Sequence, residues 1–300
     1  MKNLSVKEQL IAQQNDRVAP DLTKFTNARI AIGHSGGHTR TKNWLDFQLD
    51  FAAAKDAVYN ELNLTKLADN IRQITDREIY PANSLVTSLD QFLTRPDLGR
   101  SINPESHEQL IQLCTENPGF IAQDVLIVIS SGLSSLAIEN HAVVLLNQLL
   151  PLFAKMGWSV APIIISKQTR VAFADKVNDI FKAKVVLNLI GERPGLSSND
   201  SMSIYFTYNS KINSTDEQRN CISNIHCNGL SYIQAAEKLT YLLHRAFELG
   251  YSGVQLKDDF SPAALQQILG GANYVSQNTF KKDIDGLAYL GNGSWTGNQR

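Results

Sequence analysis

The chain has 300 residues, of which 43% are hydrophobic and 19% charged, and its 28 basic and 29 acidic residues give a net charge of −1. This length suffices for one large core or two smaller ones. The near-neutral charge gives no sign of the basic surface that nucleic acid or an anionic membrane would require.

The sequence gives no indication of a signal peptide, a membrane segment or a set of disulfides. Residues 1–5 lack the apolar segment of a signal peptide, and the most apolar helical stretch, residues 136–153, is interrupted by polar residues and by Pro151. Three cysteines cannot form an even disulfide framework, and their spacing fits no zinc site. We therefore expect a cytoplasmic protein with reduced thiols and no membrane segment. These cysteines are Cys114, Cys221 and Cys227.

The chain begins with a polar tail and a glycine-rich loop. Residues 1–25 form the predicted N-terminal tail, since their helical pattern is weak. Residues 33–38 form the loop and contain two histidines, His34 and His38, which are candidate metal ligands. Two histidines without a third ligand at fixed spacing are more typical of a surface loop.

A mostly helical domain is expected over residues 26–117. Apolar residues recur with a period near 3.6 from Thr41 onward, which predicts an amphipathic helix. Between two later helices lies a charged turn in which Arg95 and Arg100 either flank a helix connection or act as forked donors at an interface. Further helical segments are predicted at 64–79, 88–93 and 104–116.

From residue 118 the pattern alternates between strands and helices. This alternation predicts a Rossmann-like, mostly parallel sheet with flanking helices over residues 118–260, and hence an α/β fold. Residues 202–208 alternate between apolar and polar side chains, which predicts a half-exposed edge strand, and residues 219–225 are taken as a loop. Parallel strands are expected at 125–129, 160–165 and 185–190, with helices up to about 155, at 171–182 and at 231–250.

The C-terminal extension comprises residues 261–300. Ser261 and Pro262 predict the start of a short helix. The Gly- and Asn-rich segment that follows retains four aromatic residues, which indicates that it docks on this chain or on a partner.

The loop after the third parallel strand is the candidate binding site. Glu192 stands in a Gly-Glu-Arg-Pro-Gly sequence directly after that strand, and ligands of open α/β sheets bind at the carboxyl ends of the strands. Because Arg193 would keep Glu192 ionised, the carboxylate suits a hydrogen-bond acceptor better than a proton shuttle. Cys221 could be a nucleophile near His226, although its apolar neighbours favour a packed side chain.

Two common chemistries are disfavoured. The loop at 131–135 has one glycine, so it does not match the GxGxxG turn of dinucleotide sites. It also lacks the last glycine of a hydrolase elbow, because Leu136 stands there. The sequence offers no self-contained catalytic set and no metal site, which predicts a protein that works with a partner.

Several strings closely resemble the small (light) subunit of ethanolamine ammonia-lyase. Together they extend over about residues 28–255. The longest are Val-Val-Leu-Asn-Leu-Ile-Gly-Glu-Arg-Pro-Gly-Leu at 185–196 and Arg-Asn-Cys-Ile-Ser-Asn-Ile-His at 219–226. Supporting matches are Arg-Pro-Asp-Leu-Gly-Arg at 95–100, two short runs within 128–134, and residues 49–58.

The resemblance implies an adenosylcobalamin-dependent carbon–nitrogen lyase that converts ethanolamine to acetaldehyde and ammonia. It implies a large TIM-barrel subunit that holds ethanolamine and carries the radical chemistry, in a higher hetero-oligomer. The small subunit then closes over the cofactor and supplies no catalytic residue. By motif, the cobalamin contacts map to Val171, Glu192 and Cys221.

The sequence also departs from the family it resembles. Ser131 stands where an aspartate is usual, and this is the one hint for the alternative of a non-catalytic Rossmann-like cobalamin carrier or scaffold. The N-terminal stretch is shorter than in members that are packaged into a bacterial microcompartment, and that compartment is the alternative to a location in the cytoplasm at large.

Overall fold

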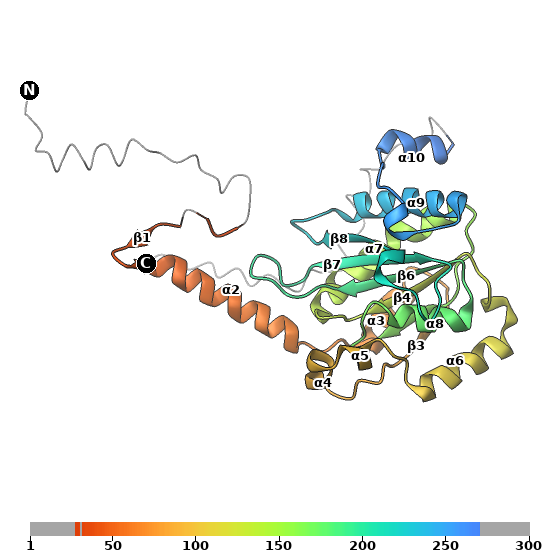
Figure 1. Cartoon of the computed structure of the whole chain (residues 1–300), viewed down its shortest axis with the longest axis horizontal. Coiled ribbons are helices and arrows are strands. Elements are labelled where there is room, and N and C mark those ends of the chain that lie inside the picture. The colour runs from red at the N-terminus through yellow and green to blue at the C-terminus, as the bar shows by residue number, and fades with distance from the viewer. Residues whose placement is uncertain (1–27, 31, 271–300) are drawn as a thin grey trace, which may run out of the picture.

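The computed structural model describes residues 28–30 and 32–270. Its centre is a six-stranded mixed sheet with helices on both faces, so the predicted α/β class with flanking helices is confirmed (Figure 1). The predicted tail at 1–25 and the part of the predicted extension from residue 271 onward lie outside the described residues.

Four parallel strands and two antiparallel strands make up the sheet. The parallel strands are β3, β5, β4 and β6 in spatial order, and β7 and β8 extend the sheet in antiparallel pairing beyond β6. Their bounds are β3 Ile79–Pro81, β4 Val125–Ser130, β5 Ile163–Ser166, β6 Val185–Gly191, β7 Met202–Tyr208 and β8 Arg219–Ile225.

Helices bury the two faces of the sheet in separate apolar clusters. One cluster lies between the sheet and α3, α7 and α9, and the other lies between the sheet and α6 and α8. The helices are α2 Thr41–Tyr59, α3 Leu64–Arg72, α4 Leu89–Thr94, α5 Pro96–Gly99, α6 Pro104–Glu116, α7 Ser135–Lys155, α8 Phe173–Phe181, α9 Tyr232–Leu249 and α10 Pro262–Ile268. Single 3-10 turns are η2 Pro118–Phe120, η3 Asp216–Gln218 and η4 Gly253–Gln255.

Capping residues correctly predicted where α9 begins and ends and where α10 begins. Ser231 accepts from the backbone N–H of Gln234 and forms a capping box with it at the start of α9. Gly250 ends that helix in the left-handed conformation, as predicted. Ser261 likewise caps α10, ahead of Pro262. The helix predicted at 64–79 is shorter, because α3 ends at Arg72 and the chain then forms β3.

Two expectations about the antiparallel strands are wrong. Residues 219–225 are not a loop but β8, which lies at the edge of the sheet. β7 is therefore not an edge strand, since β6 and β8 flank it and most of its residues are buried. The polar residues of β8 concealed the strand, because only Ile222 and Ile225 turn fully into the core.

The described part of the segment 26–117 contributes to the sheet and to the core of the rest of the described chain. β3 pairs with β5, while α3 and α6 pack on opposite faces of the sheet. The sequence analysis did not predict β3, because this strand has only three residues and the last of them is a proline. The expected separate helical domain is therefore not seen as a unit of its own, and the boundary near residue 118 stays a prediction.

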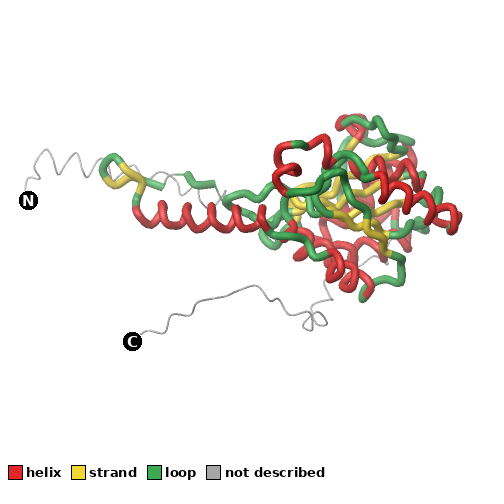
Figure 2. The backbone as a smooth tube through the Cα atoms, turned by 90° about the horizontal axis from the view of Figure 1, so that it is seen from below, coloured by secondary structure: helices red, strands yellow, loops and turns green. Residues whose placement is uncertain are grey.

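Helix α2 projects from the body of the molecule (Figures 1 and 2). The predicted helix is present, yet much of its apolar face is left uncovered by the described residues, since Leu45 is 61% and Leu49 is 70% exposed. Only Ala54 and Ala57 are buried. At its start lies a small hairpin of β1 (His34–Ser35) and β2 (His38–Thr39), both exposed.

Helix α7 lies in the core. Among the described helices it alone has the length and composition that a membrane span requires, and half of the relevant window is buried inside the fold. It packs against α9 and the central strands, as a core helix does.

Candidate functional site

The loops after β4 and β6 pack tightly on each other at one end of the sheet. β5 lies on one side of β4 and β6 lies on the other. The order in which the chain adds strands to the sheet therefore reverses at the boundary between β4 and β6. A Cβ on Gly132 would lie 2.2 Å from the carbonyl oxygen of Gly191, and Gly132 has a positive φ of 52°. The backbones of the two loops therefore meet directly between β4 and β6.

Glu192 follows β6 directly and lies at the carboxyl end of that strand, as predicted. Its Oε1 accepts a hydrogen bond from the backbone N–H of Asn224 (3.1 Å) and another from the hydroxyl of Ser203. The carboxylate thus connects the end of β6 to β7 and β8. Among the described residues its Oε2 accepts no hydrogen bond, so one carboxylate oxygen remains available to a ligand.

Cys221 lies on β8 opposite Tyr205 of β7. A substantial part of the residue is exposed, but neighbouring atoms crowd its thiol, and this desolvation raises the pKa of Cys221. Hydrogen bonds with Tyr205 and Ser203 oppose the shift. A thiol with a raised pKa stays protonated at neutral pH, which suits a small neutral contact and not a nucleophile.

Val171 lies in the turn before α8, after the carboxyl end of β5. Its carbonyl oxygen accepts a hydrogen bond of 3.3 Å from the side-chain amide of Asn188 on β6. This contact ties the turn to the sheet on the side of α8.

The sheet register brings Cys221 to the same face as the Asn188 amide that holds Val171. Asn188 pairs with Tyr205, and Tyr205 pairs with Cys221, so these three side chains share one face of the sheet. The residues between them, such as Leu189 and Ile204, turn into the opposite core. Glu192 lies at the end of this face, next to the carboxyl end of β6. The polar groups of the face are Asn188, Ser203, Tyr205, Thr207, Arg219 and Cys221.

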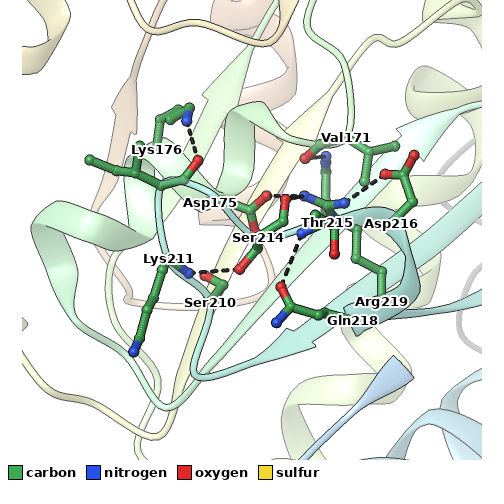
Figure 3. A network of polar contacts seen from close by, with 12 residues as sticks. Val171, Asp175, Lys176, Ser210, Lys211, Ser214, Thr215, Asp216, Gln218 and Arg219 are labelled. Carbon is green, nitrogen blue, oxygen red and sulfur yellow. Dashed lines mark hydrogen bonds and ion pairs between the residues drawn. The ribbon is translucent and has the colours of Figure 1, made fainter. Parts of the chain in front are cut away.

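A buried ion pair secures the same face (Figure 3). Asp175 of α8 and Arg219 of β8 form an ion pair, and their side chains are only 3% and 4% exposed. Arg219 also donates to the carbonyl of Ser214 (2.9 Å) and pairs with Asp216 (2.6 Å), and Val171 belongs to this network. Burial raises the pKa of Asp175, and the bond from Arg219 opposes that shift. The pair fixes β8 against α8.

A second polar cluster holds the loop that follows Glu192. Asp200 lies 3.1 Å from Nε2 of the buried His141 on α7, whose Nδ1 lies 2.9 Å from the hydroxyl of Tyr232. The hydrogen bond with His141 lowers the pKa of Asp200. The hydroxyl of Ser134 also donates to the carbonyl of Asn199 (2.9 Å). Residues 193–201 are thereby anchored to the start of α7.

The serines of the loop after β4 have structural partners. Ser134 caps α7 by accepting from the backbone N–H of Ala137. Ser131 accepts from the backbone N–H of Gln168 (2.8 Å) and is buried. These contacts give both hydroxyls a role in joining loops and in capping a helix.

Sequence reasoning placed Glu192 but missed the groups around it. Ser203 and Asn224 hold its carboxylate, and neither stood out in the sequence. The one available signal was the alternation of Ser203, Tyr205 and Thr207, which marks a polar face of a strand. The Asp175–Arg219 pair gave no signal, because 44 residues separate its partners.

The fold and this face define an α/β protein with polar side chains on one face of β6, β7 and β8. Glu192 alone of these lies beside the carboxyl ends of parallel strands, where such folds bind ligands. Within residues 28–30 and 32–270, no group of three or more His, Cys, Asp and Glu side chains could hold a metal ion.

Comparison with known proteins gives the family. Residues 16–257 match the family model described as ethanolamine ammonia-lyase light chain, and the chain belongs to this family. It is 44% identical over 238 residues to the ethanolamine ammonia-lyase small subunit of Pseudomonas putida W619, covering 79% of this chain and 86% of the relative. It is 40% identical over 259 residues to that of Pseudomonas syringae pv. tomato, covering 85% and 89%.

A relative outside that genus agrees. The ethanolamine ammonia-lyase small subunit of Xanthomonas campestris is 43% identical over 238 residues, covering 79% of this chain and 86% of the relative. The resemblance found in the sequence is thus confirmed, and with it a place in a lyase. The name small subunit implies that a large subunit completes the enzyme.

Proposed function

We propose that this chain binds adenosylcobalamin at an interface with the large subunit of ethanolamine ammonia-lyase, through Val171, Glu192 and Cys221. The large subunit is proposed to be a TIM barrel that holds ethanolamine, and the assembly a higher hetero-oligomer. The Rossmann-like interpretation is part of this proposal, because it predicts a ligand beside the carboxyl ends of β5 and β6. The observation that carries it is the Glu192 carboxylate, held at that position with one oxygen unused.

The residues of the face fit such a cofactor. Cobalamin presents amides around the corrin ring, which can donate to Oε2 of Glu192. Val171 and the neutral thiol of Cys221 offer small contacts to apolar parts of the ligand. When bound, the cofactor supplies the radical chemistry of the reaction. This chain's residues bind and orient it, and they cover one side of it.

A reconstitution experiment tests the function. We expect acetaldehyde to form from ethanolamine and adenosylcobalamin when both subunits are coexpressed, and not when either is present alone. Full activity of the large subunit by itself would contradict the proposal. Fractionation of cells would place the enzyme in the cytoplasm or inside a microcompartment.

Substitution of Glu192 tests the site. Glu192→Ala removes the acceptor and is expected to weaken cobalamin binding to the assembled complex by about 1 to 3 kcal/mol, the usual effect of stranding a hydrogen-bond partner. Glu192→Gln keeps an acceptor oxygen and should lose less. Glu108→Ala, at an exposed position of α6, serves as the matched control. Equal affinity of the wild type and Glu192→Ala, measured by equilibrium dialysis, would remove this residue from the site.

The alternative of a non-catalytic carrier rested on Ser131. Since Ser131 joins the loops after β4 and β5 through Gln168, the serine has a structural use that does not depend on losing a lyase partner. A carrier would bind cobalamin with unchanged affinity in the absence of the large subunit, and the same dialysis experiment distinguishes the two functions.

A further inference from the structure

Three arginines lie at the end of the sheet that holds the proposed cofactor site. Arg170 immediately precedes Val171, and Arg193 immediately follows Glu192. Arg100 ends the short helix α5, which lies against the same turn because the backbone N–H of Arg170 donates to the carbonyl of Gly99 (2.8 Å). Segments that are far apart in the sequence therefore bring three guanidinium groups to one end of the sheet.

Arg170 is the fixed member of this arginine cluster. Its Nη2 donates to the carbonyl oxygen of Phe92 (2.7 Å), and its guanidinium lies 4.2 Å from the centre of the Phe92 ring. Its Nε is buried and has no hydrogen-bond partner among the described residues. Arg100 and Arg193 are exposed, whereas Arg170 is half-buried.

The cluster lacks a counter-charge. Burial, followed by the positive charges of Arg100 and Arg193, lowers the pKa of Arg170, and no carboxylate opposes this shift. Within the described residues none of the three forms an ion pair with an acidic side chain. Five other arginines do form one, namely Arg29, Arg72, Arg95, Arg219 and Arg245.

Two carboxylates close to the cluster in sequence have hydrogen-bond partners other than its three arginines. Glu192 is adjacent to Arg193 in the chain, but its Oε1 is bound to Ser203 and Asn224 on the side of β7 and β8. Asp97 lies within α5, but it accepts two hydrogen bonds from Arg95, of 3.0 and 2.7 Å. Like charges repel at short range, so an anion between them would stabilise the arrangement.

We propose that Arg100, Arg170 and Arg193 form a site for a phosphate oxyanion, and that the phosphodiester of the cofactor's nucleotide loop occupies it in the assembled enzyme. This inference rests on the proposed function and adds three residues to it. Guanidinium groups match phosphate oxygens in geometry and charge, and Arg170 and Arg193 adjoin the proposed contacts Val171 and Glu192.

The test compares two corrinoids on the two-subunit complex. Cyanocobalamin carries the phosphodiester, and cobinamide lacks the nucleotide loop. The variants are Arg100→Gln, Arg193→Gln and their combination, because both side chains are exposed and their loss should leave the fold intact. Arg72→Gln, 58% exposed and paired with Asp69 on α3, is the matched control.

We expect the double variant to bind cyanocobalamin about 10- to 100-fold more weakly than the wild type, as loss of charged hydrogen bonds implies, with cobinamide affinity and the control unchanged. An equal loss for both corrinoids, or no loss, would overturn the inference and leave the proposed function intact. If the wild-type complex binds neither corrinoid, the proposed function fails, and the phosphodiester assignment fails with it.

Two further readouts separate the remaining sources of negative charge. Titration of inorganic phosphate into the chain alone, followed by calorimetry, is expected to show weak binding that the double variant loses. Phosphate binding of this kind without any change in corrinoid selectivity would identify free phosphate as the ligand and overturn the phosphodiester assignment. A folded double variant that no longer assembles with the large subunit would assign the arginines to acidic groups of that partner and overturn the inference.

Discussion

The two longest helices of the described chain have similar lengths and opposite surroundings. Helix α7 has 21 residues and buries ten of them between the sheet and α9, whereas α2 has 19 residues and buries two alanines. Both sequences carry apolar residues at helical spacing. The comparison teaches that such spacing predicts a helix and an apolar face, but not whether this chain or another covers that face. Under the proposed function, the large subunit is the candidate cover for α2.

The largest effect is expected inside α7. Leu145 is fully buried, so Leu145→Ala removes apolar contacts and leaves a cavity, which should lower the free energy of unfolding by about 2 to 5 kcal/mol. Leu45→Ala on α2 makes the same chemical change at an exposed position and should alter stability by less than about 0.5 kcal/mol. Urea denaturation of both variants measures the difference in the free energy of unfolding. Equal losses of stability would contradict the distinction drawn between α7 and α2.

An intermediate effect is expected where α7 holds the loop after Glu192. Asp200→Asn removes the charge that His141 and Asn140 bind, and should lower the free energy of unfolding near pH 7 by about 1 to 3 kcal/mol. Because the folded-state pKa of Asp200 is lowered, its stabilisation is present above the unfolded pKa and is lost as the pH falls through the folded value.

The difference between the wild type and Asp200→Asn should therefore narrow as the pH falls below about 4, the usual range of an aspartate. Unfolding curves collected from pH 7 to pH 3 give this profile. A difference that stays constant over that range would show that the charge of Asp200 contributes nothing.

The smallest effect on the isolated chain is expected on α2. Leu49→Ser changes a side chain that is 70% exposed, so unfolding should shift by less than about 0.5 kcal/mol. In the complex, the same change should weaken assembly with the large subunit by about 1 to 2 kcal/mol if the helix is covered there. Sedimentation of mixed subunits measures this. Unchanged assembly would mean that α2 is exposed in the enzyme as well.

The sequence predicted those parts of the fold whose signals are local. The caps Ser231 and Gly250 bounded α9, and an apolar run interrupted only by Asn188 marked β6. β8 escaped notice because its fully buried residues are only Ile222 and Ile225, so the strand exists through its pairing with β7. Pairing between distant segments follows from the whole fold and not from the residues of one segment.

The candidate site divides in the same way. The position of Glu192 at the end of a parallel strand could be predicted, because a buried run precedes it in the chain. Its partners Ser203 and Asn224, and the approach of Arg100 to Arg170, depend on tertiary packing between segments that share no local pattern. The roles of Val171, Glu192 and Cys221 stay predictions until the binding experiments are made.

The two edge strands of the sheet, β3 and β8, differ in how readily they can pair with a further strand and so in their tendency to aggregate. β3 has three residues and ends at Pro81, which limits further strand addition, whereas β8 has seven residues and no strand on its outer side among the described residues. In the described part of the chain only a single bridge, between Ile225 and Leu230, covers part of the outer side of β8, and an edge left open in this way can recruit a second strand during overexpression and nucleate insoluble aggregates. Production of this polypeptide without its companion should therefore yield more inclusion bodies than coexpression does.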